Sequence, residues 1–165
     1  MFDLDETLVH ATKERLDRKP DFRFEDYGVF IRPHLRFMLE AIAPRFDIAV
    51  WSSATKIYVE SAVKQLFGDV AELKFAWSID RCVQRVEPNS NGYVYIKDLR
   101  KVQGQGYAVE GILIVDDSPE KIVRQPRNHV LISAFTGAED DDALLELPAR
   151  LVHAAEVMKK STVGN

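Results

Sequence analysis

The 165 residues are 46% hydrophobic and 29% charged, the size and composition of one globular domain, residues 1–165, that can bury a substantial core. The 26 acidic and 22 basic residues give a formal charge of −4, which argues against a general nucleic-acid binder because such proteins usually carry a basic face. The single cysteine, Cys82, excludes an internal disulfide framework, and we expect a buried structural thiol in a reducing compartment. No apolar run is long enough to cross a bilayer and no secretory signal is visible. We therefore expect an intracellular protein, cytoplasmic or, in a eukaryote, nuclear.

The first ten residues, MFDLDETLVH, place two aspartates directly after apolar residues. Open α/β sheets carry their chemistry at the carboxyl ends of strands. Asp3 and Asp5 cannot both be core residues, because an unpaired buried carboxylate is costly, so we expect a cation there, and a divalent ion fits. An isolated Asp-x-Asp can also simply cap a turn. Only Met1 and Phe2 precede Asp3, whereas strands usually have about five or six residues. Either the natural protein extends upstream or this strand is unusually short.

The next segment, residues 11–26, is polar and charged without a clear period, so we interpret it as a loop over the mouth of the site. Residues 27–31 predict a short strand that leads into Arg32-Pro33-His34. Pro33 suits the first position of a helix, and apolar residues at helical spacing continue it from Leu35 to Ile42. A helix start explains this tripeptide without any chemistry.

A second apolar strand is predicted over residues 46–51, and it ends at Ser52-Ser53-Ala54-Thr55. Small hydroxyl residues between a strand and a helix can bind phosphate through hydroxyl and backbone N–H groups, or can merely cap the helix. An amphipathic helix is expected over residues 57–67, with Gly68 as its C-cap.

The middle of the chain predicts a strand at 73–77 and an irregular segment at 78–94, in which the turn 88–92 suggests a hairpin. The string Tyr95-Ile96-Lys97-Asp98-Leu99 follows. A lone lysine is usually a surface residue. Residues 103–107 (QGQGY) are expected to form a loop.

The strongest later signal is the apolar strand 111–115, which runs into Asp116 and Asp117. Capping explains the following Ser118 and Pro119, which are set to start a helix, but not two adjacent acids at the end of a buried strand. A further strand is predicted at 130–132 and an acidic turn at 137–142. The final helix, 143–160, is expected to be broken near Pro148.

Strands that alternate with helices predict an α/β fold, a three-layer α/β/α sandwich with a mainly parallel central sheet and a small β insert. The strand ends would then place Asp3, Asp5, Ser52 and Asp117 around one crevice. Neither the 11–26 loop nor the 69–93 insert is long enough for a large cap domain. The crevice should therefore be open, which suits a phosphorylated side chain on a protein.

The D-x-D-x-T pattern of Asp3, Asp5 and Thr7 resembles the haloacid dehalogenase superfamily of aspartate-nucleophile phosphatases. The fuller string DLDETLVH resembles one branch of it, the small C-terminal-domain phosphatases, also called NLI-interacting-factor-like. Ser52 and Lys97 stand at the places of the second and third motifs, and Asp116-Asp117 at the fourth. The resemblance covers nearly the whole chain.

This resemblance implies a mechanism and a set of roles. Asp3 would be the nucleophile that forms an aspartyl-phosphate, and Asp5 the general acid and then base. Mg²⁺ would be held by the Asp3 side chain, the Asp5 backbone carbonyl and Asp117. Ser52 and Lys97 would bind the phosphate together with Thr7, which also orients the loop carrying Asp5. Asp116 would hold Lys97 in a salt bridge.

The chain also departs from the family pattern. An arginine commonly stands three residues before the cysteine, where this chain has Ile79, with an arginine at Arg81 instead. Residues 103–107 replace a compact Gly-Arg-Asp turn, and the first loop is shorter than usual. Many relatives have Asn at the place of Asp117, so the extra charge here should tighten metal binding.

The resemblance favours phosphoserine or phosphothreonine on a protein as the substrate, without implying the RNA polymerase tail, since a bacterial homologue is equally compatible. A small phosphate ester or a nucleic-acid phosphate end is an alternative within enzymes. A catalytically silent binding module is the alternative from another class, and the presence of Asp3, Asp5 and Thr7 argues against it.

Overall fold

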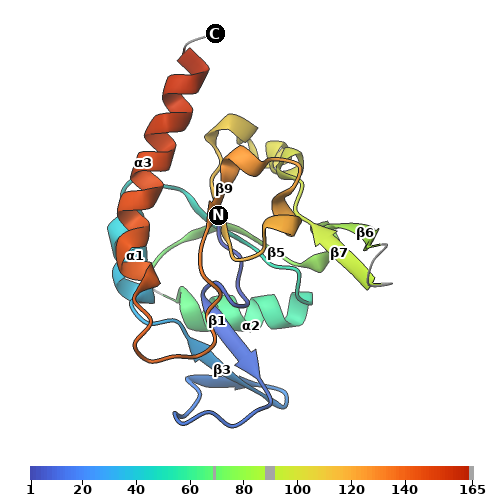
Figure 1. The fold of residues 1–165 in the computed structure, drawn as a ribbon, viewed down its shortest axis with the longest axis vertical. Coiled ribbons are helices and arrows are strands. Elements are labelled where there is room, and N and C mark those ends of the chain that lie inside the picture. Colours follow the sequence, from blue (N-terminus) through green and yellow to red (C-terminus); the bar gives the residue numbers. More distant parts are fainter. Residues whose placement is uncertain (69, 88–91, 164–165) are drawn as a thin grey trace.

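The computed structural model describes residues 1–68, 70–87 and 92–163, and it has a mixed α/β fold (Figure 1). The strands are β1 (Val9–Thr12), β2 (Phe22–Phe24), β3 (Tyr27–Ile31), β4 (Ile48–Trp51), β5 (Leu73–Trp77), β6 (Val83–Glu87), β7 (Gly92–Ile96), β8 (Ile114–Asp116) and β9 (His129–Leu131). The α-helices are α1 (Leu35–Ile42), α2 (Lys56–Leu66) and α3 (Ala143–Val163). Short 3₁₀-helices complete it: η1 (Ile79–Arg81), η2 (Leu99–Gln105), η3 (Val109–Gly111), η4 (Pro119–Ile122) and η5 (Pro126–Asn128).

The centre of the molecule is a row of parallel strands. β5 pairs with β4, and β8 pairs with β9, both in parallel. Phe2 joins the two pairs, because it forms parallel bridges with Val50 of β4 and Val115 of β8. The carboxyl ends of these segments therefore meet at one edge, which is the edge where Asp3 follows Phe2.

The two faces of this sheet are covered differently. Successive strand residues point to opposite faces, so Val115 and Ile114 belong to separate clusters of buried side chains. The cluster with Val115 packs against α1, α2 and α3, whereas the cluster with Ile114 packs against residues of η2 and η4. The predicted α/β fold is confirmed. Among the described residues, α-helices contribute to one buried cluster and 3₁₀-helices to the other, while the three-layer sandwich stays a prediction.

The predicted 11–26 loop is wrong in part. β1 and β2 both pair with β3 in an antiparallel three-stranded sheet, at the lower end of Figure 1. In β2, Phe22 and Phe24 are half-buried and flank an exposed Arg23, an alternation typical of a strand but too short to predict one. The Phe24 ring lies edge-on to Tyr58 of α2, with the ring centres 5.1 Å apart.

The start of the first helix also differs from the prediction. Pro33 is not the first helical residue, because α1 begins at Leu35 and His34 has a left-handed backbone with φ 66°. Apolar spacing correctly located the helix, since Leu35, Met38, Leu39 and Ile42 are all buried.

The strand at 73–77 and the hairpin are found as predicted. β6 and β7 pair in antiparallel register from Val83↔Ile96 to Glu87↔Gly92, and most of the predicted turn, residues 88–91, lies outside the described residues. The predicted 103–107 loop is wrong in its first part, since η2 extends to Gln105. Gly106, with φ 88°, ends that helix.

The expected break near Pro148 is wrong, because α3 runs without interruption from Ala143 to Val163 with Pro148 inside it. Proline removes one backbone hydrogen bond from a helix. The buried side chains of Leu144, Leu147 and Leu151 lie on both sides of the proline and hold the helix against the core. Ser118 and Pro119 do start a helix, but it is the 3₁₀-helix η4. Among the described residues, no helix is both long and apolar enough to cross a membrane.

Candidate active site

Asp3 lies at the centre of the site. Its backbone N–H donates to the carbonyl of Val115 (3.0 Å), which fixes it beside the end of β8. Its side chain is 1% exposed, and its two oxygens face two ammonium groups: Oδ1 lies 2.8 Å from Lys97 Nζ and Oδ2 lies 3.3 Å from Lys121 Nζ. Burial alone would raise the pKa of Asp3, but the charges of the two lysines outweigh it and lower that pKa below its usual value. Asp3 is therefore an ionised carboxylate.

Lys97 lies directly after β7 and is fully buried. Its Nζ is 2.6 Å from Asp116 Oδ2 and 2.8 Å from Asp3 Oδ1, so one ammonium joins the two carboxylates. Burial and the nearby Asp3 charge raise the pKa of Asp116 despite this contact. The structure thus brings Lys97 and Asp116 together as the sequence analysis expected, while their roles stay predictions.

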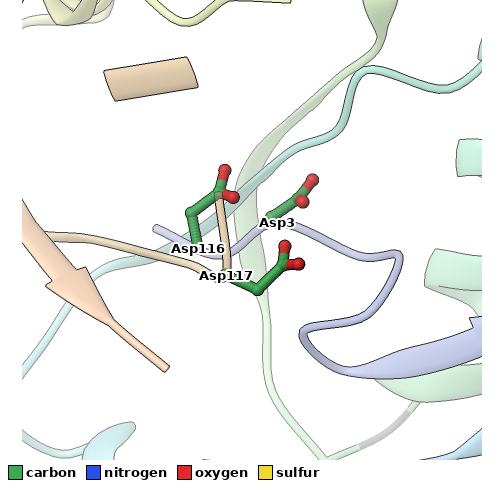
Figure 2. A group of neighbouring side chains, drawn as sticks. All are labelled: Asp3, Asp116 and Asp117. Atoms are coloured by element: carbon green, nitrogen blue, oxygen red, sulfur yellow. The ribbon is translucent and has the colours of Figure 1, made fainter. Parts of the chain in front are cut away.

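Three carboxylates form a cluster that could hold a metal ion. Asp3, Asp116 and Asp117 each offer an oxygen, and these oxygens lie within 4.8 Å of one another (Figure 2). An oxygen-only donor set fits Mg²⁺, and these residues therefore fit the ion that the sequence analysis expected. The side-chain cluster contains Asp116, for which the sequence analysis expected a salt bridge with Lys97 and not a contact with the metal. It does not contain the side chain of Asp5, for which we predict a backbone carbonyl contact.

Asp5 has a partner that the sequence did not reveal. The hydroxyl of Tyr58, a buried residue of α2, donates to Asp5 Oδ1 at 2.8 Å. Burial raises the pKa of Asp5 to about 6, although the Tyr58 hydrogen bond opposes the shift. A carboxyl group with this pKa can give up and take back a proton near neutral pH, as a general acid and base must.

The two predicted hydroxyl residues are both buried. Ser52 follows β4, and its Oγ accepts a hydrogen bond from the N–H of Ala54 (3.0 Å), so it caps the following turn and keeps its own proton available. Thr7 Oγ1 has no hydrogen-bond partner among the described residues. The structure therefore leaves both hydroxyl protons free to donate, and phosphate binding stays a prediction for them.

A buried arginine holds the loop of the first motif. Arg32 is 1% exposed and makes a bidentate contact with Asp141 (Nε–Oδ1 2.7 Å, Nη2–Oδ2 2.9 Å). Its Nη1 donates to the carbonyls of Thr7 (3.1 Å) and Ser133 (2.9 Å). The Arg-Pro-His tripeptide therefore does more than start a helix, because its arginine ties the loop after Asp5 to the acidic turn before α3.

Asp98 organises the neighbourhood of Lys97. Hydrogen bonds from Arg100, together with Arg124 and Gln125, hold the pKa of Asp98 well below its usual range even though burial opposes this. These contacts tie η2 to the chain after η4. Two cationic partners thus fix the residue that follows Lys97.

Lys121 is the main site residue that sequence reasoning missed. It belongs to η4, four residues after Asp117, and the carbonyl of Lys121 accepts the N–H of Lys97 (2.8 Å). Burial would lower the pKa of Lys121, but Asp3, Asp116 and Asp117 outweigh it and raise that pKa. A basic residue shortly after the paired aspartates is the only signal that the sequence offers.

Two further features lie beside this site or away from it. Cys82 is half-buried rather than fully buried, and burial raises the pKa of its thiol, so it is a weak nucleophile. A cavity of about 300 Å³ lies at the opposite, amino end of the strands, lined among others by Met1, Ile48 and Leu113. Because none of the clustered carboxylates lines it, this cavity is separate from the site.

Comparison with known proteins gives a consistent result. The model of a family described as NLI interacting factor-like phosphatase matches residues 1–162. A CTD nuclear envelope phosphatase 1B of Danio rerio is 28% identical over 162 residues, covering 89% of this chain and 62% of that protein. A CTD small phosphatase-like protein 2 of Dictyostelium discoideum is 28% identical over 155 residues, covering 89% of this chain and 25% of that protein.

The fold is similar to a solved structure of Fcp1, described as an essential RNA polymerase II CTD phosphatase. The TM-score is 0.61 at 18% identity, over 97% of this chain and 49% of that one. The chain therefore spans less than two thirds of each of these three proteins.

Proposed function

Because the chain belongs to the NLI interacting factor-like phosphatase family, we propose that it is a Mg²⁺-dependent phosphatase that forms an aspartyl-phosphate on Asp3. The observation that carries the proposal is the state of Asp3. It is an ionised, buried carboxylate at the carboxyl edge of the parallel strands, and an ammonium faces each of its oxygens. Asp5 follows two residues later with a pKa of about 6.

The first step is attack by an Asp3 oxygen on the phosphorus atom. A bond forms between this oxygen and phosphorus, and the bond from phosphorus to the substrate oxygen breaks. Asp5, protonated at the start, gives its proton to the leaving oxygen. This acid assistance is worth a factor of about 10²–10⁴.

The second step releases phosphate. Asp5, now ionised, takes a proton from a water molecule that attacks phosphorus, and the bond to Asp3 breaks. Lys97 offsets negative charge beside the nucleophile throughout, and the Ser52 hydroxyl would donate to a phosphoryl oxygen. Mg²⁺, held by Asp3 and Asp117 and the Asp5 carbonyl, would supply the positive charge that lets two anions approach.

Phosphoserine or phosphothreonine on a protein is the substrate class that we propose. The relatives named above are described as a CTD nuclear envelope phosphatase and an RNA polymerase II CTD phosphatase. The segments that flank the site, a three-stranded sheet and a two-stranded hairpin, are small. A small cover suits a substrate side chain that projects from a protein. We also keep an intracellular location, cytoplasmic or nuclear, as a prediction.

The test is hydrolysis of p-nitrophenyl phosphate with Mg²⁺ and with EDTA. Wild type should be active only with Mg²⁺, and Asp3→Asn should lose activity by a factor on the order of 10³ or more, the scale of losing a nucleophile. Asp17→Asn, an exposed carboxylate, is the matched control and should keep full activity. A folded Asp3→Asn variant that remains active would overturn the mechanism. Hydrolysis of a set of phosphoserine and phosphothreonine peptides then tests the proposed substrate class.

A further inference from the structure

A cation that the chain itself supplies lies against the carboxylate cluster. Lys121 Nζ is 3.3 Å from Asp3 Oδ2, and Asp3 is one of the three carboxylates that could hold a metal ion. The backbone of Lys121 is fixed on both sides, because its N–H donates to the carbonyl of Ser118 (3.1 Å) and its carbonyl accepts from Lys97 (2.8 Å). The 3₁₀-helix η4 therefore positions the Lys121 side chain beside Asp3.

The two lysines of the site are not equivalent. Lys97 has no exposed side-chain surface and makes two contacts, at 2.6 and 2.8 Å. The Lys121 side chain is 20% exposed, and within the described part of the chain its ammonium makes one ion pair, the longer contact of 3.3 Å with Asp3. A lysine that reaches water can move its ammonium group along a flexible four-carbon stem. Lys121 is thus the cation that can leave the cluster, and Lys97 the one that stays.

The balance of charge in the cluster also distinguishes Lys121 from Lys97. The three clustered carboxylates carry three negative charges, and Lys97 offsets one of them. Two negative charges remain, which match a divalent cation. The Lys121 ammonium offsets one of these two, so it stands against the binding of an ion with two positive charges.

We propose that Lys121 competes with the divalent cation for the oxygens of Asp3 and Asp117, and so sets how much Mg²⁺ the protein needs. This inference rests on the proposed function, which requires the ion at these residues. When the ion is absent, Lys121 keeps Asp3 ionised and paired. When the ion binds, the ammonium moves toward solvent, where it can meet an anionic substrate.

The test is calorimetric titration of Mg²⁺ into the protein without substrate. Lys121→Met removes the charge at similar side-chain length and should bind Mg²⁺ about tenfold tighter or more, since like charges a few ångströms apart repel by kilocalories even at an effective dielectric of about 20. Lys121→Arg keeps the charge and should bind about as weakly as wild type. Lys64→Met, at an exposed position of α2, is the control and should not change the dissociation constant.

A second measurement follows the ammonium itself. Acetylation of Lys121 by acetic anhydride, which transfers an acetyl group to the amine and releases acetate, is quantified by mass spectrometry. It should become faster when Mg²⁺ is added to wild type, while Lys64 should react at a constant rate. Faster labelling and tighter binding in Lys121→Met together support the competition.

Three other outcomes of the Mg²⁺ titration have different meanings. Equal or weaker binding in a folded Lys121→Met variant overturns this inference and leaves the proposed Mg²⁺ requirement intact. Binding in neither protein overturns both the inference and the metal requirement. Binding only in Lys121→Met supports the inference in its strongest form, because the ammonium then excludes the ion from wild type.

Discussion

At the scale of single residues, the balance of charge around Lys97 decides stability. The ammonium joins Asp3 and Asp116, which are 1% and 0% exposed. Removing one partner of a buried ion pair leaves an uncompensated charge. Lys97→Met should therefore destabilise the protein by about 3–5 kcal/mol in urea unfolding, against no measurable change for the exposed Lys64→Met.

A double variant separates repulsion from lost packing. Lys97→Met with Asp116→Asn removes the charge on Asp116 as well, so the double variant should be more stable than Lys97→Met alone. If the two substitutions instead add their costs, the stabilising role of Lys97 is packing and not charge.

The raised pKa of Asp5 makes a prediction about pH. Its folded pKa of about 6 lies above the unfolded value, so the folded state binds this proton more tightly. The contribution to stability is full below about pH 4 and is lost as the pH rises through 6. In EDTA, Asp5→Asn should gain stability relative to wild type between pH 4.5 and 7.5, by up to about 3 kcal/mol for two pKa units. Thermal unfolding at the two pH values measures this, and a constant difference would contradict it.

At the scale of elements, the central strand ends could be predicted, because an apolar run followed directly by acids is typical of a buried strand that ends at a polar site. Asp3 and Asp116 belong to such runs, and the parallel pairing of Phe2 with β4 and β8 brings their ends together. Lys121, Tyr58 and Asp141 could not be assigned. Their contacts join residues 118, 53 and 109 positions apart, and no local pattern encodes such pairs.

Contacts with distant parts of the chain also explain why the helix break predicted near Pro148 is absent. A proline in the sixth position of α3 is locally unfavourable, but three buried leucines decide the outcome through contacts with distant parts of the chain. The loop predicted for residues 11–26 was wrong for a different reason. A three-residue strand such as β2 is too short for its alternation of buried and exposed residues to predict a strand.

Arg32 connects the loop after Asp5 with the acidic turn before α3, and removing its side chain should therefore destabilise the protein. Arg32→Ala leaves the half-buried carboxylate of Asp141 without its cation and the carbonyl of Thr7 without its donor. We expect the free energy of unfolding to fall by about 3–5 kcal/mol. Arg36→Ala is the matched control, because the Arg36 side chain is 70% exposed and pairs, among the described residues, only with Glu40. This substitution should cost under about 0.5 kcal/mol.

Hydrogen exchange keeps this prediction testable if Arg32→Ala fails to fold. Arg32→Lys keeps the charge but cannot reproduce the bidentate contact or reach both carbonyls. The amides of residues 6–8, which lie in the loop between Asp5 and β1, should then exchange faster than in wild type. Unchanged exchange there would show that Arg32 stabilises the acidic turn alone.

At the scale of the whole molecule, net charge separates the protein substrate from a nucleic-acid end. The chain carries a formal charge of −4, and nucleic-acid binding depends on many basic contacts with phosphates. A protein with six to ten such contacts loses affinity by about 10³–10⁵ between 50 and 200 mM salt. Here we expect kcat/KM for a phosphoserine peptide to change by less than about tenfold over that range, since the groups proposed to bind its one phosphate are buried and salt screens such groups weakly.

The matching measurement uses an oligonucleotide with a terminal phosphate at the same concentrations and ionic strengths. The peptide should be the better substrate at every salt concentration, and the advantage should grow as salt is raised, because any attraction of the oligonucleotide to Arg15, Lys19 or other exposed cations is screened. A steep fall of activity on the oligonucleotide from a higher value at low salt would reverse the assignment. It would mean that a local basic surface outweighs the negative charge of the whole chain.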